Sequence, residues 1–255
     1  MASVSLPILV TGASGHLGRE LACQLAGPGV HLSLWGRDEA RLELAARACR
    51  AKGATTSLRC IDLADTATAR AAFEAEDATT PFELVLLVAG QGITTTDHLV
   101  VEDPAQIARQ CHLNFTATAA LAGEAAKRLC ERKGGRIGII GSAAAFHSLP
   151  FAPSYAASKA GLARFADALR LATRPHGVTV TLATPGFIAP ENPLPGRPRR
   201  PFEMRVEQVA RIIISSVEAG RAERIIPRWF VLLKWFDRAL PRVLRDRLLS
   251  ILPRA

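Results

Sequence analysis

The chain has 255 residues, a formal net charge of +9 and a hydrophobic content of 49%. This length suits one well-buried α/β domain and this composition excludes a disordered chain, while no apolar run reaches the roughly 18 residues that span a bilayer. The five cysteines form no C-x-x-C pair, so we expect reduced core thiols and no metal site. Residues 1–9 lack the basic start of a signal peptide, and together with the reduced thiols this predicts a cytoplasmic protein.

Short apolar strands alternate with helix-length amphipathic segments along the chain. The first strand, 6–10, leads into TGASGHLG at 11–18, and the helix that follows has Leu17, Leu21 and Leu25 on one face. Further strands are expected at 30–35, 58–61, 84–88, 137–140, 178–182 and 224–227. Further helices are expected at 38–53, through Phe73, from Pro104, at 155–171 and at 206–217. This alternation predicts right-handed crossovers and a parallel sheet, the three-layer doubly wound Rossmann fold of the α/β class.

The glycines at 12, 15 and 18 lie where the first strand turns into the first helix. Backbone N–H groups at a helix start carry partial positive charge, and a glycine lets a pyrophosphate approach where a Cβ would collide. In a doubly wound fold the ligand lies beyond the carboxyl ends of the strands. We therefore expect one crevice shared by Gly12, Asp62, Gly90, Ser142 and Pro185.

Tyr155 and Lys159 are four residues apart and hence on one face of the predicted helix. A free phenol has a pKa of about 10, and a neighbouring cation favours the phenolate, so we expect Lys159 to lower that pKa toward a range useful for proton transfer. Ser142, just after strand 137–140, is placed to hydrogen-bond the same substrate oxygen. The alternative is a half-buried tyrosine beside a solvated lysine.

These residues together resemble the short-chain dehydrogenase/reductase family, which combines a glycine-rich first turn with a later serine and a Tyr-x-x-x-Lys pair. The likeness covers residues 5–190, and its other matching positions are Asn114 in HLNFTAT, Asp62-Leu63, Ala89-Gly90 and Pro185-Gly186. The resemblance implies an enzyme that interconverts a carbonyl and an alcohol, with hydride transfer by a nicotinamide cofactor.

Carried over by position, the resemblance implies four catalytic residues. Tyr155 is the acid/base that protonates the carbonyl oxygen in reduction, and Lys159 lowers its pKa and binds the nicotinamide ribose. Ser142 orients the substrate oxygen, and Asn114 holds the water that leads from Lys159 to solvent, the alternative being a structural polar residue. The implied cofactor-binding positions are Gly12, Ser14, Gly15, His16, Leu17, Gly18, Arg37, Asp62, Leu63, Ala89, Gly90, Tyr155, Lys159, Pro185, Gly186 and Ile188.

Three positions depart from the family pattern. His16 stands where T-G-x-x-x-G-x-G has a glycine, so the motif is an atypical TGxxGxxG, and its ring either donates to the pyrophosphate or faces the surface. Val88 replaces the asparagine of N-A-G, and 185–190 lacks a threonine that commonly contacts the carboxamide. The glycine spacing is similar to that of the extended branch of sugar-nucleotide enzymes, but the chain length and the Ser-to-Tyr interval of thirteen favour the single-domain type over an epimerase.

Gly36-Arg37 at the end of the second strand bears on the choice of cofactor. An aspartate here would bond a ribose 2′-hydroxyl and repel a phosphate, whereas Arg37 supplies a bidentate donor. We predict NADP(H) as the preferred cofactor, with NAD(H) as the alternative. Arg37 as an ordinary solvated arginine is the competing interpretation.

The basic residues concentrate near the C-terminus, where 197–255 holds fourteen Arg and Lys against six acids. We predict a Rossmann domain at 1–227 and a basic amphipathic extension at 228–255, in one or two helices interrupted at Pro241. The extension packs on its own core or a sister subunit, anchors the protein to a membrane surface, or forms a lid over a hydrophobic substrate. Its basic residues alternate with bulky apolar ones, which excludes nucleic acid as a partner.

The sequence thus predicts an NADP(H)-dependent oxidoreductase acting on a small carbonyl or alcohol substrate, with a hydrophobic ketone as one expectation. The resemblance implies a homodimer or homotetramer, in the cytoplasm or peripheral to a membrane. The alternative function is a nucleotide-binding regulator or scaffold without turnover.

Overall fold

The computed structural model describes residues 6–88, 90–92, 101–192, 196 and 200–250, without the side chains of 236–238, 245 and 248–250. Seven strands form one sheet in the order β3-β2-β1-β4-β5-β6-β7, with every neighbouring pair parallel. The strands are β1 (Leu6–Thr11), β2 (Val30–Gly36), β3 (Thr55–Cys60), β4 (Leu84–Leu87), β5 (Gly135–Ile140), β6 (Val178–Pro185) and β7 (Glu223–Ile226). The doubly wound fold predicted from the alternation is confirmed.

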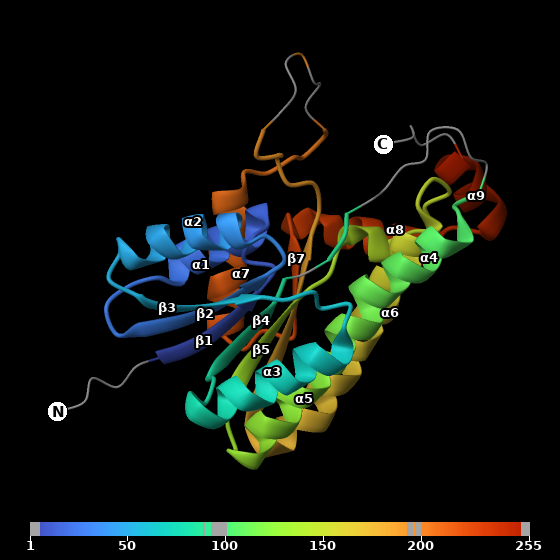
Figure 1. Ribbon diagram of the computed structural model, residues 1–255. Coiled ribbons are helices and arrows are strands. Elements are labelled where there is room, and N and C mark those ends of the chain that lie inside the picture. The colour runs from blue at the N-terminus through green and yellow to red at the C-terminus, as the bar shows by residue number, and fades with distance from the viewer. Residues whose placement is uncertain (1–5, 89, 93–100, 193–195, 197–199, 251–255) are drawn as a thin grey trace.

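Helices cover both faces of this sheet (Figure 1). The α-helices are α1 (His16–Leu25), α2 (Glu39–Arg50), α3 (Thr66–Thr79), α4 (Pro104–Cys111), α5 (Thr118–Glu131), α6 (Pro153–Thr173), α7 (Val206–Glu218), α8 (Val231–Ala239) and α9 (Arg242–Ser250). A π-helical segment, η1 (His112–Ala117), and 3₁₀ turns η2 (Ala143–Phe146), η3 (Arg174–His176) and η4 (Arg228–Phe230) complete the described elements. One core packs α1, α2 and α7 against the sheet, and the other packs α3, α5 and α6.

The apolar spacing of α2 shows why these segments fold as they do. Its buried residues are Leu42, Ala45, Ala46 and Cys49, the face predicted from the sequence. Asp38 begins the helix, because its side chain accepts a hydrogen bond from the N–H of Arg41 at 3.0 Å. The expectation that the cysteines are core residues holds for Cys49 but is wrong for Cys60, which is exposed at the end of edge strand β3.

Two element boundaries differ from the sequence predictions where they affect the site. The helix expected from Pro104 is interrupted by the π-helical segment η1 before it continues as α5. Pro185, expected just beyond a strand, is the last residue of β6, because β6 pairs with β7 through Pro185 and Ile226.

The C-terminal extension forms two helices, α8 and α9, with Pro241 between them, as its spacing predicted. One aromatic residue near its start, Phe230, packs on the body of the protein: it is buried, and its ring lies against Gly186. Leu232, Trp235 and Val243 are exposed. Among the described helices, none combines the length and the apolar character needed to cross a bilayer.

Candidate active site

The glycine-rich turn between β1 and α1 is built from close backbone approaches. Gly12 has a φ of 65°, a left-handed conformation that glycine adopts without strain, and its carbonyl accepts the N–H of Gly15 at 2.9 Å. A Cβ on Gly18 would collide with the Gly12 carbonyl group. The glycines therefore let the strand enter the helix within a few residues.

The start of α1 fits an anion. Its N-cap, Gly15, provides no side-chain hydrogen bond, and the first turn carries no acidic residue. The first backbone N–H groups of the helix thus face outward without a side-chain cap, and the helix dipole favours negative charge there. This cradle fits the pyrophosphate of a dinucleotide.

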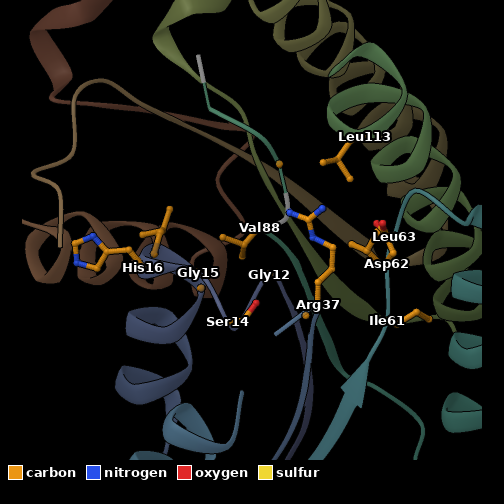
Figure 2. Close-up of a pocket in the computed structure, with 14 residues that line it drawn as sticks. Gly12, Ser14, Gly15, His16, Arg37, Ile61, Asp62, Leu63, Val88 and Leu113 are labelled. Atoms are coloured by element: carbon orange, nitrogen blue, oxygen red, sulfur yellow. The ribbon is translucent and has the colours of Figure 1, made fainter. Parts of the chain in front are cut away.

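A cleft of about 280 Å³ lies between this turn and the ends of the neighbouring strands (Figure 2). Ten of its lining residues were predicted to bind cofactor: Gly12, Ser14, Gly15, His16, Leu17, Gly18, Arg37, Asp62, Leu63 and Gly90. Gly36, Ile61, Val88 and Leu113 also line it and were not among the predicted cofactor-binding positions. Ile61 and Val88 were expected to be the last residues of their strands, and the structure ends β3 and β4 one residue earlier. Their place at the carboxyl ends of strands is a signal that sequence reasoning could have used. Leu113 lies in η1, whose approach to the cleft depends on tertiary packing.

Arg37 extends into the cleft between Val88 and Asp62 (Figure 2). It is exposed, and its guanidinium has no hydrogen-bond or ion-pair partner within the described part of the chain. At the preceding Gly36, a Cβ would crowd the hydroxyl of Ser14, whose side chain would have to move. Asp62 uses one carboxylate oxygen to accept the N–H of Ala64 at 3.0 Å, which turns the chain at this edge of the cleft.

His16 lines the cleft, but its imidazole points away from Arg37 and Asp62 (Figure 2). The pKa of the Glu191 carboxyl is lowered mainly by the hydrogen bond from Arg19. The His16 ring lies near enough to Glu191 to add a smaller contribution in the same direction. Arg19 and Arg41 pair with Glu191 at 2.6 and 3.1 Å. This arrangement favours the surface-facing alternative for the ring.

Ser142 and Tyr155 meet at the end of β5. Ser142 is the second residue after β5, and its hydroxyl accepts the N–H of Ala144 at 3.2 Å. Burial raises the pKa of Tyr155 above its ordinary value, and a side-chain hydrogen bond with Ser142 acts in the opposite direction. The ligand-free protein therefore holds a protonated phenol at neutral pH, and the lowering by Lys159 stays a prediction.

Lys159 lies beside Tyr155 on the buried face of α6. Its side chain is 5% exposed, and its ammonium donates to the carbonyl of Ile140 at 3.1 Å. Burial lowers the pKa of Lys159 to about 8, so the group is charged at pH 7. A Cβ on Gly90 would lie 3.3 Å from this ammonium and 3.1 Å from the Asn114 side-chain oxygen. Gly90 also lines the cleft, so the Lys159 ammonium lies close to the edge of the cleft.

Asn114 lies in η1 and is fully buried. Its side-chain oxygen accepts the N–H of Gln91 at 2.7 Å, and its amide nitrogen donates to the Gln91 carbonyl at 3.0 Å. The same nitrogen lies 3.4 Å from the hydroxyl of Ser158, which precedes Lys159. The structural interpretation of Asn114 thus has direct support, and its proposed water-holding role stays a prediction.

Thr11 braces the centre of the sheet, where Val88 stands in place of the family's asparagine. Its hydroxyl donates to the carbonyl of Leu86 at 3.3 Å and accepts the N–H of Val88 at 3.0 Å. This tie between β1 and the end of β4 was not predicted, because it depends on strands that are far apart in the sequence.

The remaining predicted positions lie outside the cleft or outside the described residues. Gly186 donates its N–H to the Ile226 carbonyl at 2.7 Å, and Ile188 forms an isolated bridge with Met204. Like Pro185, Tyr155 and Lys159, they do not line the cleft. Ser142 does not line it either, so the single crevice expected to include Ser142 and Pro185 is wrong in those two members. Ala89 lies outside the described residues. Among the described residues, no group of three or more His, Cys, Asp or Glu could hold a metal ion.

The comparisons with known proteins agree with this geometry. The family model described as short chain dehydrogenase matches residues 7–194. An uncharacterized oxidoreductase of Myxococcus xanthus is 30% identical over 239 residues, covering 93% of this chain and 94% of its own. Dehydrogenase/reductase SDR family member 7B of Bos taurus is 33% identical over 188 residues, covering 71% of this chain and 57% of its own.

Two solved structures share the whole architecture. The bulky-bulky ketone specific alcohol dehydrogenase from Comamonas testosteroni has a TM-score of 0.79 at 25% identity, covering 99% of this chain and 96% of its own. A short-chain dehydrogenase from Sphingobium yanoikuyae in complex with NADPH has a TM-score of 0.77 at 25% identity, covering 98% and 97%.

Proposed function

The chain belongs to the short-chain dehydrogenase/reductase family, and from this premise we propose that it is an NADP(H)-dependent enzyme that interconverts a hydrophobic ketone and its alcohol. Membership makes it an oxidoreductase acting on CH–OH or C=O groups. The observation that carries the proposal is the hydrogen-bonded Ser142–Tyr155 pair on the same side of α6 as the charged Lys159, whose ammonium lies against Gly90 at the edge of the cleft.

The nicotinamide, when bound, donates or accepts the hydride. In reduction, the Tyr155 hydroxyl gives its proton to the substrate oxygen. Burial keeps the phenol protonated beforehand. Ser142 holds the same oxygen, and the Lys159 ammonium stabilises the phenolate that is left. In oxidation, the phenolate takes the proton from the alcohol.

A carbonyl panel assayed with NADPH tests this proposal, beside Tyr155→Phe. The variant removes the proton donor but keeps the ring, so we expect turnover to fall about 100-fold or more, with NADPH binding retained. Binding of NADPH without turnover of any carbonyl by the wild-type protein would favour the scaffold alternative.

The preference for NADP(H) is proposed on the exposed Arg37 at the cleft, together with the NADPH complex of the Sphingobium relative. A charge-assisted hydrogen bond contributes about 1.5–3 kcal/mol, so Arg37→Ala is expected to weaken NADPH binding about 10- to 100-fold and leave NADH binding unchanged. Arg70 is an exposed arginine of α3 that pairs with Glu74, and Arg70→Ala is the matched control. Wild-type protein that binds NADH as tightly as NADPH would contradict the preference.

A bulky hydrophobic substrate is proposed on the partly exposed aromatic residues of the segments that follow β6 and β7. Phe202 and Trp229 have ring centroids 4.1 Å apart, and Phe187 is 40% exposed on the segment after β6. Lys234 of α8 lies 5.5 Å from the ring centroid of Phe146 in η2, which directly follows Ser142. The ketone named for the Comamonas relative supports the same class. Diaryl ketones are therefore expected to be reduced with higher kcat/KM than ketones of the size of acetone.

We further propose a domain at 1–227 with an extension at 228–255, assembled as a homodimer or homotetramer in the cytoplasm. Five free cysteines support this location. The exposed Leu232, Trp235 and Val243 suit a second subunit or a membrane surface. Sedimentation of full-length and 1–230 protein, with and without anionic liposomes, separates the two: loss of the oligomer in 1–230 supports a subunit contact, and loss of liposome binding supports peripheral membrane contact.

A further inference from the structure

The catalytic helix α6 begins without a cap of its own. Its N-cap, Ala152, offers no side-chain hydrogen bond, and Pro153 at the first position has no N–H. The first N–H of the helix is therefore that of Ser154, directly before Tyr155. The carboxylate of Glu102, 52 residues earlier in the chain, accepts this N–H at 3.0 Å. Glu102 is 7% exposed, so a buried negative charge lies at the positive end of the helix.

Gln110 of α4 holds the same serine by its side chain. The Ser154 hydroxyl donates to the Gln110 side-chain oxygen at 2.6 Å, and the Gln110 amide nitrogen donates to the Gly92 carbonyl at 2.8 Å. The Gly92 carbonyl fixes the orientation of the amide, because only its nitrogen can donate there. Gln110 is 1% exposed, and Ser154 is 4% exposed.

The arrangement repeats one helical turn further on. Asn114 follows Gln110 by four residues, and Ser158 follows Ser154 by four. Asn114 connects Gln91 to Ser158 as Gln110 connects Gly92 to Ser154. Each serine directly precedes a predicted catalytic residue, Tyr155 or Lys159. Two parallel polar bridges thus join the loop after β4 to the helix that carries both.

We propose that Gln110 and Glu102 are positioning residues for Tyr155, because they fix Ser154 against the loop after β4. The resemblance to the family brought only Asn114 into consideration, whereas the Gln110 bridge and the Glu102 cap come from the contacts in this structure. The inference rests on the proposed role of Tyr155. Removing the bridge frees the start of α6 and lets the phenol move relative to Ser142, and misplacement by about 1 Å can lower a rate 100-fold.

The test uses variants that remove the contacts one at a time in the full chain. Gln110→Leu removes both bonds of the bridge, and Ser154→Ala removes the hydroxyl but keeps the N–H bonded to Glu102. Gln110→Glu accepts the Ser154 hydroxyl but cannot donate to Gly92. Glu102→Gln keeps an acceptor for the Ser154 N–H, whereas Glu102→Leu does not. Asp103→Ala is the matched control, since Asp103 is the exposed neighbour that caps α4 at the N–H of Gln106 at 3.0 Å.

Three readouts are measured: kcat with a diaryl ketone, Kd for NADPH, and tyrosinate absorbance at 295 nm against pH. Tyr155 is the only tyrosine of the chain, so the absorbance reports this residue without substrate or cofactor. We expect Gln110→Leu and Ser154→Ala to lower kcat about 10- to 100-fold, with Kd within about twofold. Their absorbance midpoint should fall toward pH 10, because water reaches a loosened phenol. Glu102→Gln should retain more activity than Glu102→Leu, and Asp103→Ala should change none of the three.

Wild-type kcat and an unmoved absorbance midpoint in Gln110→Leu and Ser154→Ala would overturn the proposal, even if both variants melt at a lower temperature. A fall in kcat that follows weaker NADPH binding, with an unmoved midpoint, would also overturn it, because the bridge would then serve the cofactor loop. Failure of the proposed function is distinguishable: the wild-type protein would reduce no ketone, while the absorbance midpoint would still report the position of Tyr155.

Discussion

Replacing Lys159 with methionine should stabilise the fold while it removes activity. The lysine is 5% exposed, and burial lowers its pKa from 10.5 to about 8. Below pH 8 the folded protein therefore carries a buried ammonium whose only described hydrogen bond is to the Ile140 carbonyl at 3.1 Å. Methionine has a similar length and no charge, so it fills the space without this desolvation penalty.

The magnitude follows from the pKa. Each unit of pKa change corresponds to about 1.4 kcal/mol, so a fall from 10.5 to about 8 means that the buried charge destabilises the fold by about 3 kcal/mol below pH 8. Losing the hydrogen bond to Ile140 removes about 1 kcal/mol of this gain. The net stabilisation of about 2 kcal/mol should raise the Tm by about 4–8 °C in a chain of this size.

The effect has a defined pH dependence. Between pH 8 and 10.5 the unfolded lysine keeps its proton while the folded one releases it, so this group makes the wild-type protein more stable as pH rises. The advantage of Lys159→Met should therefore be largest below pH 8 and disappear before about pH 10.5, where the lost hydrogen bond to Ile140 makes the variant the less stable protein.

Urea unfolding of both proteins at pH 7 and pH 9.5 measures the difference. Lys127→Met, at an exposed position of α5, is the control and should change the free energy of unfolding by less than about 0.5 kcal/mol. A Lys159→Met protein that is less stable than wild type at pH 7, or a gain that is the same at both pH values, would refute the reasoning.

Three further predictions concern single positions. In the ligand-free protein, absorbance at 295 nm should show the Tyr155 phenol titrating above pH 10, because burial raises its pKa; a midpoint below 10 contradicts this, and Tyr155→Phe provides the baseline. Gly18→Ala should abolish NADPH binding, measured by fluorescence titration, because the new Cβ collides with the Gly12 carbonyl; Gly123→Ala, with open space around it, is the control. Phe230→Ala should lower the free energy of unfolding by about 3 kcal/mol, measured in urea, since its ring is buried; a loss below about 1 kcal/mol would mean that the extension is not part of the core.

The sequence predicted most of the fold because its signals are local. The buried face of α2 and the break at Pro241 follow from helical spacing and proline chemistry, which neighbouring residues determine. The glycines of TGASGHLG indicated the cradle for the same reason, since each acts through its own backbone. The placement of Tyr155 and Lys159 on one side of α6 was also local, because four residues span one helical turn, while the effect of the ammonium on the phenol stays a prediction.

Tertiary structure decided the environment in which these residues act. The cap of α6 by Glu102 and the bridge through Gln110 join residues that are 18 to 52 positions apart in the chain. The π-helical segment that carries Asn114 also appeared only in the structure. Burial likewise raises the pKa of Tyr155 and lowers that of Lys159, and no spacing of residues along a chain fixes how deeply a side chain is covered. Periodicity specifies which face of a helix is apolar, but the desolvation and the hydrogen bonds of a polar group depend on the elements that pack around it.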